Sequence, residues 1–189
     1  MSRVYCAGPL FNESERTEMA AIAQVLEKAG HTTFLPHRDG FEYAQLLPEL
    51  TPICGSDTAN AVLQQAIFAL DVYELLRACD GVVANLNGRV PDEGTVVEAA
   101  LAWHARQPLV LYKADDRSLI AGSDNPMIVG LSNLKVVSDL DEIPEVLKEQ
   151  SMQIGNRVEE TLARGREVVT ANRDLDHKDL ADRLLKLFA

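Results

Sequence analysis

Short apolar, β-branched runs alternate with longer helical stretches over the first 150 residues. The predicted strands are Val4–Ala7, Thr32–Leu35, Val82–Leu86, Leu109–Tyr112 and Lys135–Val137. Helices are predicted at Glu13–Ala29, Asp57–Ala78, Gly94–Ala105, Asn125–Leu131 and Asp141–Glu149. Near-continuous apolar strands separated by helices are typical of a parallel sheet covered on both faces. The pattern therefore predicts an α/β fold with a doubly wound, five-stranded parallel sheet.

Five strands in such an alternation favour the flavodoxin-like order 2-1-3-4-5. In that arrangement a ligand binds at the carboxyl ends of the strands, where the strand order reverses between the first and the third strand. Here those ends are residues 7–11 and 85–92. The topology therefore predicts a binding site between these two loops.

Two segments differ from this alternation. Residues 34–52, after the second strand, are rich in turn residues and aromatics, and they could form a lid over the pocket. Residues 151–189 carry apolar side chains at helical spacing amid charged ones, which predicts two amphipathic helices. We therefore expect a catalytic domain over residues 1–150 and a C-terminal helical extension over 151–189, packed on that domain or on another subunit.

Composition narrows the class of ligand. A hydrophobic content of 47% in 189 residues suits one domain with a sizeable core. The balance of 18 basic against 29 acidic residues gives a net charge of -11, which disfavours binding to nucleic acid or to an anionic membrane. A small-molecule ligand is expected instead. The polar start of the chain lacks the pattern of a signal peptide, and we expect a cytoplasmic protein.

Cysteine and histidine usage predicts neither a disulfide framework nor a metal site. The three cysteines are odd in number and widely spaced, and the four histidines are scattered along the chain. We therefore expect core thiols and chemistry carried by other side chains.

Glu98 is the candidate for that chemistry. Asp92 is a plausible N-cap, so Glu98 falls within the first two turns of a helix, among Val96, Val97, Ala99 and Ala100. The helix N-terminus favours a carboxylate by about 0.3–1 kcal/mol, while apolar neighbours oppose its charge. We expect a carboxylate that is ionised yet poorly hydrated, as a nucleophile requires. The alternative is a solvated acid on the helix surface.

Several motifs together resemble the nucleoside 2-deoxyribosyltransferase family. They are Tyr5-Cys6-Ala7-Gly8-Pro9-Leu10-Phe11 with Glu15-Arg16, Asp80 with residues 82–88, Asp92-Glu93-Gly94-Thr95 with Glu98, Tyr112-Lys113 with Asp116-Arg117, and Asn125-Pro126-Met127. One such motif alone would be weak evidence of the family, but the ordered set spans residues 3 to about 147. The resemblance implies no role for the C-terminal residues after about 150.

The resemblance implies exchange of the base of a 2′-deoxynucleoside, an activity of nucleotide salvage, with Glu98 as the catalytic nucleophile. Glu98 would form a deoxyribosyl ester that a second, free nucleobase opens, a retaining double displacement that needs no cofactor. Asp71 matches the acid that protonates the departing base. The interval from Asp71 to Asp80 is one residue longer than in some relatives, and the alternative for Asp71 is an exposed helical acid.

The resemblance also implies which sugar binds. Asp92 and Asn125 match residues that hold a free 5′-hydroxyl, whereas serines stand at these places in the related nucleoside monophosphate hydrolases. A 5′-phosphate would be repelled by the Asp92 carboxylate. In the family, the residue matching Asn125 reaches the substrate of a neighbouring subunit, so a homo-oligomer with shared active sites is expected. The alternatives are an N-cap for Asp92 and a turn for Asn125.

The remaining candidates are substrate contacts. Gly8 and Pro9 would let the sugar approach the backbone, and Tyr5 and Phe11 would line the sugar or base pocket, although a turn and core aromatics are the alternatives. Asp39 and Gly40 lie where relatives recognise the base. Gly94 and Met127 complete the predicted site.

Two competitors to the transferase remain open. An N-glycoside hydrolase acting on nucleosides or their 5′-monophosphates would open the same ester with water, and exclusion of water is not visible in a sequence. A non-catalytic nucleoside-binding module would have no need of a buried nucleophile. Lys113 and Arg117 are predicted to order a loop through ion pairs rather than to act in catalysis.

Overall fold

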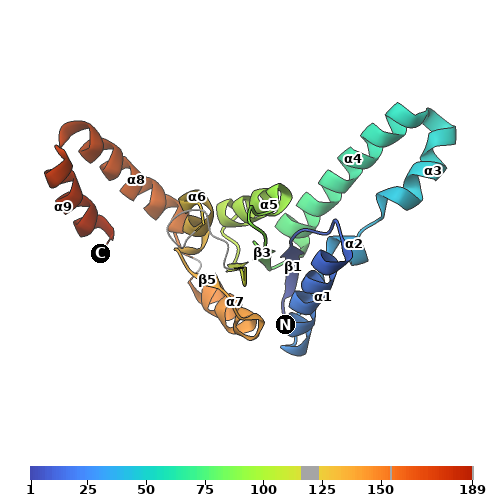
Figure 1. Ribbon diagram of the computed structural model, residues 1–189, viewed down its shortest axis with the longest axis horizontal. Helices are drawn as coiled ribbons and strands as arrows, with labels where there is room; N and C mark the ends of the chain where they lie inside the picture. The colour runs from blue at the N-terminus through green and yellow to red at the C-terminus, as the bar shows by residue number, and fades with distance from the viewer. Residues whose placement is uncertain (116–123, 154, 189) are drawn as a thin grey trace. The chain divides into compact units, whose positions relative to one another are not determined.

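The computed structural model describes residues 1–115, 124–153 and 155–188 (Figure 1). By its internal contacts the chain divides into two compact units, Met1–Gln153 and Ile154–Ala189. No helix within the described residues is long and apolar enough to cross a membrane.

The first unit contains the predicted parallel sheet. Its strands are β1 (Arg3–Ala7), β2 (Thr32–Phe34), β3 (Gly81–Asn85), β4 (Leu109–Tyr112) and β5 (Val136–Val137). They pair in the order β2-β1-β3-β4-β5, and every pairing is parallel. The flavodoxin-like order predicted from the sequence is confirmed. β1 and β3, whose ends were expected to form the site, are direct neighbours in register Tyr5 to Val82.

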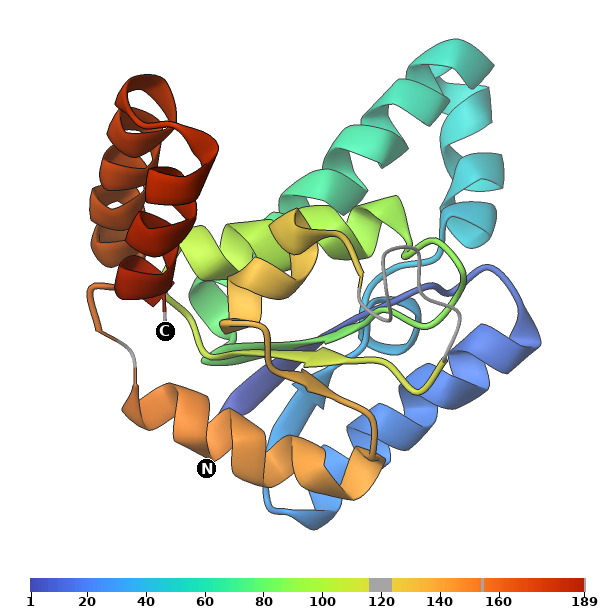
Figure 2. The same cartoon turned by 60° about the vertical axis from the view of Figure 1, so that its left-hand side comes forward.

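Helices cover both faces of this sheet (Figure 2). One face packs on α1 (Glu13–Lys28) and α7 (Ile143–Met152), and the other packs on α5 (Glu93–His104) and the segment η1 (Glu74–Ala78). Successive residues of a strand point to opposite faces, so Val4 and Cys6 join the first core cluster whereas Tyr5 and Ala7 join the second. This alternation places the Tyr5 side chain on the α5 side of the sheet.

The predicted helix over Asp57–Ala78 is divided into two parts. It is α-helical over α4 (Ser56–Tyr73) and then becomes a π-helical turn, η1, in which Cys79 N donates to Glu74 O at 2.9 Å. Such turns hold one more residue than α-helical geometry and often occur at functional sites.

The segment 34–52, expected to be rich in turns, instead contains α2 (Pro36–Asp39) and most of α3 (Tyr43–Cys54). α3 is helical although Pro48 and Pro52 lie inside it. Proline removes a helical hydrogen bond and normally disfavours such a segment, but α3 packs along α4, and this tertiary contact outweighs the local preference. α6 (Pro126–Val129) and the 3₁₀ turns η2 (Gly130–Ser132) and η3 (Leu140–Glu142) complete this unit.

The second unit is a helical hairpin, as the amphipathic tail predicted. It consists of α8 (Arg157–Asp174) and α9 (His177–Phe188). Arg183 of α9 pairs with Glu167 of α8, and Leu162 and Phe188 stay largely exposed.

Gly8 ends β1 where only a hydrogen fits. A Cβ built at this position would lie 2.1 Å from Sδ of Met19 and 3.1 Å from Cβ of Asn85, and both side chains are fully buried. We expect Gly8→Ala to lower the free energy of unfolding by about 1–3 kcal/mol, the usual effect of overpacking a core. Urea denaturation followed by circular dichroism would measure this loss.

Gly130→Ala is the matched control for this substitution. A Cβ at Gly130 would meet no atom within 4 Å, so its stability should stay within about 0.5 kcal/mol of the wild type. Equal effects at the two positions would contradict the packing argument.

Candidate active site

Glu98 and Tyr5 form a short hydrogen bond at the centre of the first unit. The Tyr5 hydroxyl donates to Glu98 Oε1 at 2.6 Å. Tyr5 is fully buried in β1, where its ring stacks on Phe34 with the centroids 5.4 Å apart. A fully buried phenol cannot move far, so it fixes the direction of the carboxyl group. Glu98 Oε2 makes no hydrogen bond within the described residues.

Burial raises the pKa of Glu98 to about 7. The Tyr5 hydrogen bond stabilises the carboxylate and lowers this pKa, while the negative charges of Asp71 and Asp92 raise it further. Desolvation outweighs the hydrogen bond. The sequence-based expectation of a poorly hydrated group agrees with this burial, and the raised pKa opposes the ionisation that was also expected of Glu98.

Glu98 lines a cavity of about 330 Å³ between α4–η1 and α5. Asp71, near the end of α4, lines the same cavity, and the other walls are mostly apolar: Phe68, Val72, Leu75, Glu93, Gly94, Val97 and Leu101. Burial raises the pKa of Asp71 to about 6, with a contribution from the charge of Glu74. Two carboxyl groups thus line one mostly apolar cavity, and burial raises the pKa of each.

The π-helical turn η1 begins at Glu74, three residues after Asp71 on the chain. It lies inside the interval from Asp71 to Asp80. Arg3 of β1 forms an ion pair with Glu74 at 2.5 Å, and Gln107 Nε2 donates to the carbonyls of Leu75 and Cys79 at 2.7 and 3.0 Å. These contacts hold the turn against the sheet, so that Asp71 faces the cavity of Glu98.

Asp92 caps α5 with a single oxygen. Its Oδ2 accepts from Thr95 N at 2.8 Å and from Thr95 Oγ1 at 2.9 Å, whereas Oδ1 has no partner within the described chain. A Cβ at Gly94 would lie 3.1 Å from Oδ2, which makes a glycine the best fit beside this cap. The N-cap interpretation of Asp92 is therefore correct, and Oδ1 stays available to a ligand.

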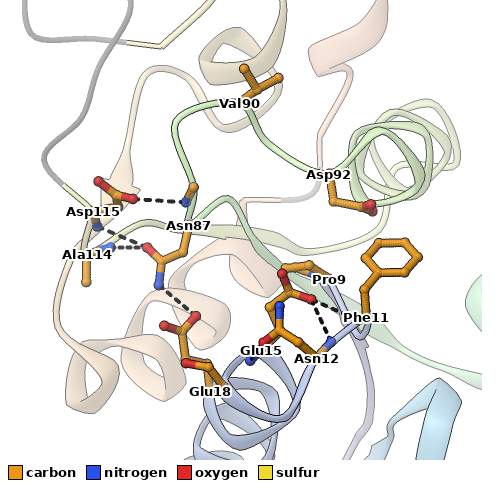
Figure 3. A pocket seen from close by; sticks show the side chains of 12 residues that line it. Pro9, Phe11, Asn12, Glu15, Glu18, Asn87, Val90, Asp92, Ala114 and Asp115 are labelled. Carbon is orange, nitrogen blue, oxygen red and sulfur yellow. Dashed lines mark hydrogen bonds between the residues drawn. The ribbon is translucent and has the colours of Figure 1, made fainter.

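A second, wider cavity of about 570 Å³ opens at the carboxyl ends of β1 and β3 (Figure 3). Pro9, Phe11 and Asp92 line it, and its other carboxylates are Glu15, Glu18 and Asp115. No lysine or arginine is among its lining residues. Phe11 is 80% exposed at this cavity.

Asn87 holds this second cavity together. Figure 3 shows its side chain between the loop after β4 and helix α1: Oδ1 accepts from Ala114 N and Asp115 N at 2.8 and 3.0 Å, and Nδ2 donates to Glu18 Oε2 at 3.2 Å. This role was not predicted from the sequence. The only signal was the position of an asparagine after β3, at the point where the strand order reverses.

Asn125 caps the short helix α6. Its Oδ1 accepts from Met127 N at 2.9 Å, which leaves the Nδ2 amide without a partner in the described chain. Asn125 and Met127 are exposed, and neither lines the two cavities described above. Within one chain, the structure does not bring these two residues to Glu98.

The other predicted residues have structural partners. Asp39 accepts from Leu35 N at 2.8 Å and pairs with Arg38; although burial opposes its charge, the hydrogen bond from Arg38 holds its pKa below the usual range. A Cβ at Gly40 would lie 2.6 Å from the carbonyl oxygen of Pro36.

Lys113 pairs with Asp124, while Arg117 lies outside the described residues. Among the described residues, no group of three or more histidines, cysteines or acids could hold a metal ion.

Comparison with known structures shows the same fold. A 2-deoxyribosyltransferase from the psychrotolerant bacterium Bacillus psychrosaccharolyticus shares 22% identity, with a TM-score of 0.55 over 75% of this chain and 90% of its own. A conserved protein from Enterococcus faecalis V583 also shares 22% identity, with a TM-score of 0.53 over 79% of this chain and 99% of its own. No curated protein matches the sequence.

The sequence itself matches a family model over most of its length. The model describes nucleoside 2-deoxyribosyltransferases, and the match runs from residue 4 to residue 178, which includes the sheet, both cavities and α8. Together with the five-stranded parallel sheet, this match shows that the chain belongs to the nucleoside 2-deoxyribosyltransferase family.

Proposed function

We propose that this protein exchanges the base of a 2′-deoxynucleoside through a deoxyribosyl ester on Glu98. The observation that carries this proposal is the Glu98 carboxyl group, held by the buried Tyr5 hydroxyl and facing Asp71 across a mostly apolar cavity. A solvated surface acid would have neither a fixed direction nor a raised pKa. A binding module would gain nothing from burying two acids side by side.

The free oxygen of Glu98 is the nucleophile in this proposal. Because Tyr5 occupies Oε1, Oε2 attacks C1′ of the deoxyribose, and the bond from C1′ to the base nitrogen breaks. Asp71 gives its proton to the departing base. In the second half, a new base attacks C1′, Glu98 leaves as a carboxylate, and Asp71 takes the proton released by the incoming base. Two inversions at C1′ retain its configuration.

Proton sharing between the two acids sets the reactive state. The reaction needs Glu98 ionised and Asp71 protonated, one proton between the two carboxyl groups. The pKa of Asp71 is raised to about 6 and that of Glu98 to about 7, so within this interval the pair holds one proton, mostly on Glu98. The reactive form, with the proton on Asp71, is the minor one of the two singly protonated forms. Below the interval both acids are protonated and Glu98 cannot attack; above it both are ionised and Asp71 cannot protonate the base.

Asp92 and Asn125 support a preference for nucleosides over nucleotides. Capping leaves Asp92 Oδ1 to accept the proton of a 5′-hydroxyl and Asn125 Nδ2 to donate to its oxygen. A 5′-phosphate would instead meet Asp92 and the three further carboxylates of the wider cavity, with no lysine or arginine in its lining to balance them.

The active site is shared between subunits in our proposal. Asn125 and Met127 are exposed and line neither cavity of their own chain, so in this proposal a second copy brings them to Asp92. A homo-oligomer with a self-complementary interface provides this arrangement.

Glu98→Gln should lower the rate of base exchange by several orders of magnitude, because the amide cannot act as the nucleophile. The test is a chromatogram of deoxyinosine incubated with and without free adenine, for the wild type and the variant. The wild type should form deoxyadenosine and hypoxanthine only when adenine is present. Free deoxyribose as the dominant product would favour the hydrolase, and wild-type turnover by Glu98→Gln would reject the nucleophile.

Folding stability provides the control for this variant. The unfolded chain loses the Glu98 proton near pH 4.5 and the folded chain near pH 7, so ionisation costs the folded state stability as pH rises through this window. Glutamine can still accept the Tyr5 hydrogen bond and has no charge to desolvate. Glu98→Gln should therefore be at least as stable as the wild type at pH 8, which separates lost chemistry from unfolding.

The pH dependence of kcat/KM should be bell-shaped, with its maximum between about 6 and 7, because only the singly protonated pair reacts. Asp71→Asn should lower the maximum and remove the fall on the alkaline side. Its remaining rise should report the ionisation of Glu98 alone and lie below about 7, since the Asp71 charge no longer raises the pKa of Glu98. An unchanged bell in Asp71→Asn would exclude Asp71 as the acid.

Mixed oligomers test the shared site. Glu98→Ala should be inactive alone and Asn125→Asp strongly impaired, but after subunit exchange some sites would combine an intact Glu98 with an intact Asn125. For a pairwise shared site, an equal mixture should recover about a quarter of the wild-type activity. A protein that is monomeric by light scattering and fully active would place Asn125 in its own chain's site. So would a mixture that recovers no activity although subunit exchange is proven.

A further inference from the structure

Lys113 and Asp124 form a buried ion pair that the reaction itself does not use. Lys113 Nζ lies 2.6 Å from Asp124 Oδ1, and the two side chains are only 5% and 6% exposed. Other ion pairs among the described residues of the first unit are more open, for example Lys135–Glu149 at 47% and 42%. A buried pair is costly to desolvate, so its presence needs a reason other than surface solubility.

The pair joins the end of β4 to the start of α6. Lys113 is held in the sheet, where its N–H donates to Val137 O at 2.8 Å. Asp124 is the residue before Asn125, whose Oδ1 caps α6. The ion pair therefore connects a rigid sheet edge to the backbone position next to the capping asparagine.

α6 cannot hold Asn125 in place by itself. The helix has four residues, and so short a helix is unstable without tertiary contacts. Its far end is anchored by the buried Val129 and by Ser132 Oγ, which donates to Lys135 O at 2.7 Å. At its near end Asn125, Pro126 and Met127 are exposed, so the buried Lys113–Asp124 pair is the anchor the structure shows there.

The pair is no phosphate site. Lys113 Nζ is buried and already neutralised by a carboxylate at contact distance, so it has neither the exposure nor the free charge to bind an anionic donor. Its effect on a ligand must pass through the residues that it holds.

We propose that Lys113 and Asp124 are positioning residues that aim the Asn125 amide, and that they thereby set how strongly the enzyme selects donors with a free 5′-hydroxyl. The claim about 5′-hydroxyl selectivity rests on the proposed function, whereas the claim that the pair holds the Asn125 cap does not. Without the pair, the cap at Asn125 opens more often, and the Nδ2 donor is no longer directed.

The test uses a variant that removes the pair without leaving a lone buried charge. Lys113→Met/Asp124→Leu replaces both partners with apolar side chains of similar length, a change that folded proteins often tolerate, whereas removal of one partner would leave an uncompensated charge. Lys135→Met/Glu149→Gln is the matched control, because it removes an exposed pair of the same kind and of the same 2.6 Å length.

The first measurement is amide hydrogen exchange by NMR. In the pair variant, exchange at Met127 N–H, which donates to Asn125 Oδ1, should accelerate about tenfold or more. Exchange at Leu134 N–H, which donates to Val129 O at the far end of the segment, should stay unchanged, as should both amides in the control variant. Unchanged exchange at Met127 would overturn the proposal whatever the activity of the protein.

The second measurement is donor selectivity, the ratio of kcat/KM for a 2′-deoxynucleoside to that for the same nucleoside lacking the 5′-hydroxyl. Asn125→Ala should lower this ratio roughly tenfold, the effect of one hydrogen bond. The pair variant should lower it by a similar factor, and the triple variant should fall no further. A folded pair variant with wild-type selectivity, or a triple variant with multiplied losses, would overturn the positioning role.

Failure of the proposed function can be distinguished from failure of the positioning role. A wild type that exchanges no base, or that ignores the 5′-hydroxyl, would reject the proposed function before any variant is made. Hydrogen exchange at Met127 would still decide whether the pair holds the cap.

Discussion

The hydrogen bond from Tyr5 to Glu98 is the constraint on which the site depends. It joins the middle of the sheet to the helix that follows the neighbouring strand, and it exists because β1 and β3 are adjacent and alternate residues of β1 point toward α5. A one-residue shift of β1 would turn Tyr5 to the opposite face and leave the carboxyl group without a partner. The strand order and the strand register are therefore part of the geometry of the candidate site.

Two opposing effects act on the Glu98 carboxyl group, and their balance is the chemically useful feature. Full solvation would keep it ionised but weakly reactive, whereas complete burial without a donor would keep it neutral. With one hydrogen bond and a mostly apolar wall, its pKa stays close to neutrality, and the nearby Asp71 has a pKa only slightly lower. Small differences in environment thus decide which of the two acids carries the proton.

Much of the fold and part of the site could be predicted from local patterns. The five strands and their order follow from apolar runs, and the importance of Glu98 follows from an acid among apolar neighbours. The helix α3 was not predicted, because Pro48 and Pro52 oppose a helix locally and only packing on α4 stabilises it. The partner of Glu98 was not predicted either, because Tyr5 and Glu98 are 93 residues apart and a strand aromatic usually serves the core. The partial protonation of Glu98 depends on how far the folded chain excludes water, which no local pattern reports.

The π-helical turn after Asp71 has a consequence for the length of this segment. A residue inserted into a regular helix would rotate everything beyond it by about 100° and displace either the acid or the following strand. The residue by which a π-helical turn exceeds an α-helical one is here confined to η1, where Arg3 and Gln107 hold the backbone, and β3 follows at Gly81. The turn therefore takes up one residue next to the candidate active site, while Asp71 still lines the cavity of Glu98 and β3 keeps its register beside β1.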